Sequence, residues 1–172
     1  MPDRWRGRRP GLAIAAILAA TLGFAALASA GGSGQTLVVR DRQGGELARV
    51  ALPAEPSFSL RYRNSLYGSL AEERFMVGAD GRMELVMLAA DEVAVLEEYY
   101  AVDGAPMPAA ASDSRRWRAA PARAVALHEL TIAATDLGER TLLVPGQPSV
   151  RLWQLVGDGN PSVIVSVEER HP

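Results

Sequence analysis

Apolar and polar residues alternate over short segments along most of the chain. Alternation with a period of two places successive side chains on opposite faces of a β-strand. Residues 57–63, SFSLRYR, are the clearest example, with Phe58, Leu60 and Tyr62 on one face and serine and arginine side chains on the other. We therefore predict a strand over residues 57–63 that has one face against a core.

Similar segments, separated by turns rich in Gly, Pro, Asn or Asp, recur to the end of the chain. They cover residues 35–40, 46–52, 72–77, 82–88, 124–133, 138–144, 150–155 and 162–168. Many short strands with regular turns and no long helical pattern are typical of sandwiches and barrels. We expect an all-β fold, a single antiparallel sandwich or partly open barrel of about nine short strands.

Two segments of the expected domain, which spans residues 37–170, lack this clear pattern. Residues 91–100, DEVAVLEEYY, fit a strand or a helix, and their β-branched and aromatic content favours a strand. Residues 102–123 are rich in Ala, Pro and Arg, so we expect a long loop at about residues 102–123. A loop of this length in a compact domain is either mobile or functional.

The first 30 residues have the pattern of an export signal. Four arginines and one aspartate precede the uncharged residues 11–27, and Ala28-Ser29-Ala30 follows as a small-x-small cleavage site. This order is typical of a secretory signal peptide over residues 1–30. The uncharged segment is also close to the ~17–25 residues that span a bilayer, so an uncleaved N-terminal membrane anchor is the alternative.

Both interpretations place the rest of the chain outside the cytoplasm, because a basic segment stays on the cytoplasmic side. We expect a secreted, periplasmic or cell-surface protein whose residues 31–36 form a flexible linker. We expect contact with a membrane only if the N-terminal segment stays uncleaved.

Composition limits the available chemistry. The chain has no cysteine, which removes disulfides, thiol nucleophiles and thiolate metal sites. The only histidines are His128 and His171, which argues against a histidine metal site. The net charge is −2, and loss of residues 1–30 would make it −5. An acidic exported domain argues against nucleic acid as a partner, and we expect no metal and no cofactor.

The turn that follows residues 57–63 carries an unusual number of polar side chains. If Arg63 pairs with Glu72 across this turn, Tyr62 lies opposite Glu73 and apolar residues face one another further along both strands. This register brings polar side chains to the end of an apolar face.

The candidate site consists of Tyr62, Asn64, Ser65 and Glu73. A carboxylate that faces a core must find hydrogen-bond donors, because its burial is otherwise costly. The cluster is therefore either a small-ligand pocket that uses Glu73, or a structural corner whose side chains bind their own turn. A hydrolase built on Ser65, Glu73 and His128 is a third and weaker hypothesis, because Ser65 is not in a strand-to-helix elbow.

This stretch resembles a bacterial exported family catalogued as domain of unknown function 1850. Members of that family have an F-x-L-x-Y-x-H-S segment followed by a proline and E-x-F, and here residues 58–65 read FSLRYRNS and residues 73–75 read ERF. Asn64 stands at the histidine position and Leu70 at the proline position. Asn retains hydrogen-bonding capacity but does not titrate near neutral pH, which argues against an acid–base role.

The resemblance implies a role in solute uptake, because genes of this family are often near TAXI-type TRAP transporters. Our leading hypothesis is an exported, non-enzymatic β-domain that serves as an accessory of a TRAP-type solute transporter. Its partner would be a membrane transporter or another envelope protein. A small-ligand-binding module and a hydrolase remain the alternatives.

Overall fold

The computed structural model describes residues 33–169. The expected export signal lies outside the described residues. The expected linker over residues 31–36 is too long, because β1 begins at Gln35. The side chain of Gln35 donates a hydrogen bond to the carbonyl of Gly78 and is buried, so this residue already belongs to the domain.

The expected all-β fold is confirmed, with twelve strands in the described residues instead of about nine. The strands are β1 (Gln35–Arg40), β2 (Glu46–Ala51), β3 (Ser57–Arg63), β4 (Leu70–Val77), β5 (Met83–Ala90), β6 (Val102–Pro108), β7 (Trp117–Pro121), β8 (Ala126–Leu127), β9 (Glu129–Ala133), β10 (Thr141–Leu143), β11 (Val150–Arg151) and β12 (Ser162–Glu169). Two short helical segments accompany them, η1 (Val95–Tyr99) and η2 (Leu152–Gln154).

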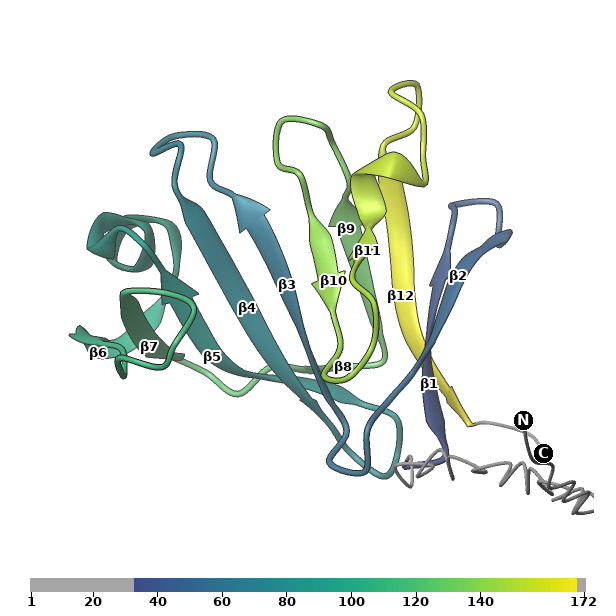
Figure 1. Ribbon diagram of the computed structural model, residues 1–172, viewed down its shortest axis with the longest axis horizontal. Coiled ribbons are helices and arrows are strands. Elements are labelled where there is room, and N and C mark those ends of the chain that lie inside the picture. Colours follow the sequence, from purple (N-terminus) through teal and green to yellow (C-terminus); the bar gives the residue numbers. More distant parts are fainter. Residues whose placement is uncertain (1–32, 170–172) are drawn as a thin grey trace, which may run out of the picture.

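The strands form two antiparallel sheets (Figure 1). The four-stranded sheet has the order β2-β1-β12-β9, and the eight-stranded sheet has the order β11-β10-β3-β4-β5-β7-β6, with β8 paired to β5. Consecutive strands β8 and β9 belong to different sheets, so the segment predicted as one strand over residues 124–133 passes between them at His128. One apolar core includes residues of both sheets, among them Leu37, Leu60 and Val163.

The alternation of β3 determines which face of the eight-stranded sheet meets the core. Phe58, Leu60 and Tyr62 are buried, whereas the residues between them are partly exposed. We call the face that carries these three residues the inner face, and the opposite face the outer face. Phe58 stacks on Phe75 of β4, with ring centroids 4.9 Å apart and planes 8° apart.

The expected register of β3 and β4 is wrong by two residues, although the shared face is correct. Tyr62 lies opposite Ala71, and Leu60 lies opposite Glu73. The cause is a shorter turn, because β4 begins at Leu70. Gly68, with a φ of 61°, helps to close this turn, since glycine adopts positive φ without the clash of a Cβ.

Within residues 91–100, residues 93–99 are helical, so the preference for a strand there is wrong. Val95 and Leu96, adjacent in sequence, are both fully buried. A strand with one wet face would expose one of them, whereas a helical turn places both against the sheet. They form a second apolar cluster on the inner face with residues that include Tyr62, Leu88 and Ala119.

The long loop expected at about residues 102–123 is instead a hairpin of β6 and β7 around a turn at residues 109–116. The prolines concealed this pattern. Pro106 and Pro108 lie on β6, which is the last strand of the sheet, and an edge strand tolerates residues that cannot donate a backbone hydrogen bond. Among the described residues there is no helix with the length and apolar character needed to cross a membrane.

Substitution Phe75→Ala tests the core at the centre of the β3–β4 pair. We expect a loss of about 3–5 kcal/mol in the free energy of unfolding, because the change leaves a cavity and removes the stacked ring. Leu66→Ala is the control, because Leu66 is 76% exposed in the turn and its loss should change stability by about 0.5 kcal/mol or less. Equal effects of the two changes in urea titrations would contradict this core.

Candidate functional site

Two of the four predicted site residues are joined, although by a residue that the sequence did not single out. Tyr100 follows η1, and its hydroxyl donates a 2.6 Å hydrogen bond to Oε1 of Glu73. The hydroxyl oxygens of Tyr100 and Tyr62 are 2.5 Å apart. Because the single proton of Tyr100 points to the carboxylate, Tyr62 is the donor of that second bond.

Burial keeps both hydroxyls of this Tyr62–Tyr100–Glu73 chain protonated. It raises the pKa of Tyr62 to about 12. Burial, together with the negative charge of Glu73, raises the pKa of Tyr100 still further. The guanidinium of Arg140 lies 4.5 Å from the ring centroid of Tyr62, in position for a cation–π contact. At neutral pH Tyr62 therefore donates to Tyr100 and Tyr100 donates to Glu73, and neither tyrosine acts as a base or nucleophile.

Asn64 holds the turn between β3 and β4. Its side-chain oxygen accepts hydrogen bonds from the backbone N–H groups of Leu66 and Tyr67, at 3.0 and 3.1 Å. The residue is 3% exposed. Ser65 is exposed in the same turn and, within the described part of the chain, forms no side-chain hydrogen bond with the other three predicted site residues. The predicted cluster is therefore a buried tyrosine and a half-buried glutamate linked by a third residue, next to a separate turn.

The geometry separates the residues of the hydrolase hypothesis. Ser65 lies in the turn before β4, whereas His128 follows β8, which pairs with Met83 at the start of β5. Met83 in turn pairs with Val77 at the far end of β4. The length of β4 thus lies between the two side chains, about 23 Å at 3.3 Å per residue. Nε2 of His128 accepts a 3.1 Å hydrogen bond from Arg82 instead.

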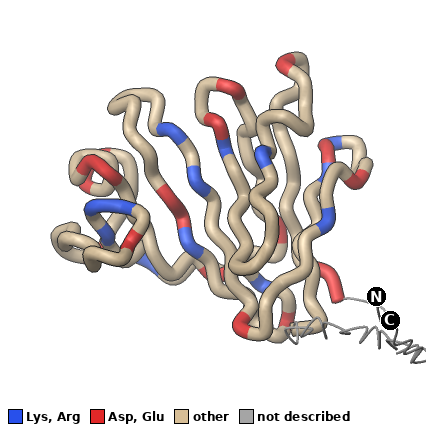
Figure 2. The backbone as a smooth tube through the Cα atoms, viewed as in Figure 1, with Lys and Arg blue, Asp and Glu red and all other residues tan. Residues whose placement is uncertain are grey.

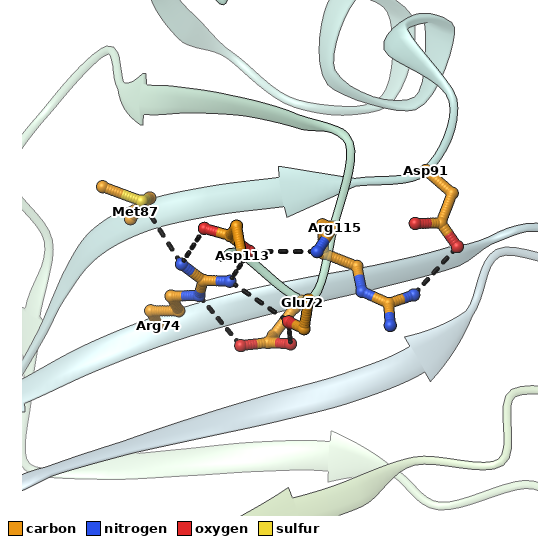
Figure 3. A network of polar contacts seen from close by, with 7 residues as sticks. Glu72, Arg74, Met87, Asp91, Asp113 and Arg115 are labelled. Atoms are coloured by element: carbon orange, nitrogen blue, oxygen red, sulfur yellow. Dashed lines mark hydrogen bonds and ion pairs between the residues drawn. The ribbon is translucent and has the colours of Figure 1, made fainter. Parts of the chain in front are cut away.

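A second polar network, which sequence reasoning missed, lies on the outer face of the eight-stranded sheet (Figure 3). Arg74 of β4 binds both carboxylate oxygens of Asp113 at 2.8 and 2.6 Å. Its Nε donates to Glu72 at 2.8 Å, and the hydroxyl of Ser114 donates to the other oxygen of Glu72 at 3.1 Å. The bidentate bond to Arg74 lowers the pKa of Asp113 to about 2.

This network fastens the β6–β7 turn over the outer face. Arg115, in the same turn, donates a 2.9 Å hydrogen bond to Asp91 at the end of β5 (Figure 3). Beneath the turn, Ala89 is 1% exposed although it belongs to the outer face. The spacing of Glu72 and Arg74, two residues apart on β4, could have indicated an ion pair on the outer face. Nothing in the local sequence indicated that Asp113, 39 residues after Arg74, would bind the same arginine.

Within residues 33–169, no three His, Asp or Glu side chains are grouped so as to hold a metal ion. Comparisons of the chain with protein-family models, with curated proteins and with solved structures gave no match.

Substitution Asn64→Ala tests the structural role of this residue. We expect a loss of about 1–2 kcal/mol in the free energy of unfolding, because two turn N–H groups lose their acceptor. Ser65→Ala in the same turn is the matched control and should change stability by about 0.5 kcal/mol or less. If the Ser65 variant were destabilised as much as the Asn64 variant, the special role of the Asn64 side chain in the turn would be refuted.

Substitution Tyr100→Phe tests the hydroxyl chain. We expect a loss of about 1–3 kcal/mol in the free energy of unfolding, because Glu73 and the hydroxyl of Tyr62 are left without their partner. Tyr99→Phe is the control, since Tyr99 is 58% exposed next to it. A Tyr99 variant that was destabilised to the same extent would contradict the assignment.

The stability of the protein depends on pH with a sign that follows from the pKa of Tyr62. A pKa raised to about 12 in the folded protein, against about 10 in the unfolded chain, means that folding favours the protonated hydroxyl. This contribution to stability is complete below about pH 10 and is lost as the pH rises through about 12. We expect tyrosinate absorbance to report this late ionisation in the wild type and to lose it in Tyr62→Phe. Ionisation of all tyrosines near pH 10 before unfolding would refute the burial of this hydroxyl.

Proposed function

We propose that the protein is an exported, non-enzymatic β-domain that serves as an accessory of a membrane transporter. The observation that carries the proposal is that the polar side chains of the predicted site are bound to one another and to their own turn. Glu73 accepts its hydrogen bond from Tyr100, and Asn64 accepts two from the backbone. Groups engaged in this way stabilise a corner of the fold and are poorly placed to attack a substrate.

Export is supported by the order of sequence features at the N-terminus. The basic segment, the uncharged residues 11–27 and the small-x-small site precede a domain whose first strand begins at Gln35. Removal of residues 1–30 would leave every described strand intact. Retention of the same residues as an anchor would hold the domain close to a membrane, which suits an accessory of a transporter equally well.

The transporter partner is supported by the resemblance to the exported family of unknown function. The residues that carry it, 58–65 and 73–75, form β3, its turn and the middle of β4. In this chain the tyrosine of the motif binds Tyr100, and the glutamate of the motif accepts from the same hydroxyl. The motif therefore describes a structural corner, so the partner surface of an accessory domain would lie elsewhere on the molecule.

The alternative of a small-ligand module at Tyr62, Asn64, Ser65 and Glu73 has less support. Three of these four side chains already have hydrogen-bond partners within the protein, and Ser65 is exposed in the turn. A ligand at this corner would have to share the carboxylate of Glu73 with the hydroxyl of Tyr100, which already binds Oε1.

Expression of the full chain in a Gram-negative host tests export. We expect the protein outside the cytoplasm, either with Gly31 as its first residue or at full length in the membrane. A variant without residues 2–30 should stay in the cytoplasm, and Ala30→Asp should prevent cleavage because the site needs a small residue. Fractionation with mass spectrometry of the N-terminus is the measurement. A full-length chain that stays in the cytoplasm like the deletion variant would overturn the proposal.

Affinity capture from native membranes, after cross-linking in cells, tests the partner. We expect the tagged protein to recover subunits of a solute transporter, and an excess of the untagged protein to reduce that recovery. A capture that contained neither a transporter subunit nor another envelope protein, or that the untagged protein did not reduce, would contradict the accessory role.

A further inference from the structure

A row of aligned residues crosses the outer face of the eight-stranded sheet. Arg151 of β11 lies opposite Thr141 of β10, and Thr141 lies opposite Arg61 of β3. Arg61 in turn lies opposite Glu72 of β4. Directly opposed residues in antiparallel strands share a face, so both arginines belong to the face that Tyr62 does not use. Figure 2 shows basic positions along β3, whereas acidic and basic positions both occur on β4.

The part of this row from β11 to β3 borders a hollow of about 420 Å³. It is lined by Arg61, Tyr62, Arg63, Leu70, Glu139, Thr141, Arg151 and Trp153. This volume lies within the range of about 300–1,000 Å³ that is usual for small-molecule sites. Trp153 belongs to η2 and contributes an indole ring to the wall.

The positive charge in this hollow is only partly compensated. Arg61 and Arg151 form no ion pair and no side-chain hydrogen bond with any residue in the described range 33–169. Arg63 faces Glu139, with a guanidinium nitrogen 3.5 Å from the carboxylate. Glu72, the acid next in the row, is engaged by Arg74 and Ser114. The hollow thus keeps two arginines without a carboxylate partner, in a chain whose net charge is negative.

The rim of the hollow contains a strained residue. Glu139 has a φ of 46°, the single positive value of a non-glycine residue within residues 33–169. Its N–H donates to Thr135, and the hydroxyl of Thr141 donates to its carbonyl. Residues held in this region of backbone space persist only where their surroundings impose it, and they concentrate at ligand sites. The carboxylate of Glu139 lies beside Arg63 and not beside Arg61 or Arg151.

We propose that this hollow binds a small organic molecule through an oxyanion, a carboxylate or a phosphate group, held by Arg61 and Arg151. The planar guanidinium group presents several N–H donors that match the oxygens of either anion. The indole of Trp153 provides a wall for the apolar part of the ligand. Arg61 and Arg151 belong to the face opposite the side chain of Tyr62, although Tyr62 also lines the hollow. The site would function whether or not the protein has a transporter partner.

Calorimetric titration of the exported protein, in the form in which it is recovered, tests the site. The probes are benzoate and succinate as carboxylates, phenyl phosphate and glycerol phosphate as phosphate esters, and benzamide and glycerol as neutral analogues. Inorganic phosphate and chloride at matched ionic strength are the controls for simple charge. We expect at least one organic anion to bind with a Kd below about 1 mM and the neutral analogues not to bind. Comparison of the carboxylate probes with the phosphate ester probes shows which oxyanion the site selects.

Two substitutions locate the binding. Arg61→Gln and Arg151→Gln should each weaken it by about tenfold or more, because each removes a charged hydrogen bond. Arg42→Gln is the matched control, since it removes the same charge from an exposed turn next to the four-stranded sheet. Arg151 is also exposed, so its loss leaves the core intact. Thermal unfolding of each variant verifies folding.

Three outcomes would overturn the proposal. The first is that no organic anion binds. The second is that the Arg42 variant weakens binding as much as the Arg61 and Arg151 variants. The third is that inorganic phosphate or chloride binds as tightly as every organic probe, which would reveal only a diffuse attraction for anions.

Discussion

The pairing of β3 with β4 is the constraint on which the rest of the structure depends. Successive side chains of each strand point to opposite faces of the sheet. These two strands therefore supply the stacked Phe58 and Phe75 to the inner face and Glu72 and Arg74 to the outer face. A slip of one residue would exchange the faces and bury the charges. The stacked rings oppose such a slip from within, and the bond of Arg74 to Asp113 opposes it from the outer face. Core and surface thus specify the same register.

Glu73 shows how the fold accommodates an exception to this division. Its carboxylate belongs to the inner face, opposite Leu60, where an unpaired charge would be costly. The hydroxyl of Tyr100 supplies the missing donor, and Tyr62 completes the chain. Tyr100 reaches this position because η1 folds back over the inner face with Val95 and Leu96 buried beneath it. The helical turn therefore contributes both apolar area and one specific hydrogen bond, which explains why a strand would not serve at this position.

Local sequence patterns predicted the features that depend on neighbouring residues in the chain. They failed for features that depend on residues far away in the sequence. The alternation of residues 57–63 correctly predicted the strand and its buried face, because periodicity is a property of the segment itself. The register with β4 depends on the length of the turn, and Asn64 shortens that turn through backbone contacts that no periodicity shows. Tyr100 lies 27 residues after Glu73, in a segment whose pattern fitted two structures. The hairpin of β6 and β7 was hidden because its prolines, tolerated on an edge strand, looked like loop residues.

The two faces of the eight-stranded sheet also differ in how completely their polar groups are used. On the inner face, the hydroxyls of Tyr62 and Tyr100 and the carboxylate of Glu73 are bonded to one another. On the outer face, the carboxylates near the β6–β7 turn are bound by Arg74 and its neighbours. Arg61 and Arg151, which lie towards β11, have no carboxylate partner among the described residues. The pairings of β10 with β3 and with β11 place Arg61 in line with Arg151, across one intervening strand. Two arginines without a carboxylate partner thereby border the same hollow, which is the arrangement that recognition of an anion requires.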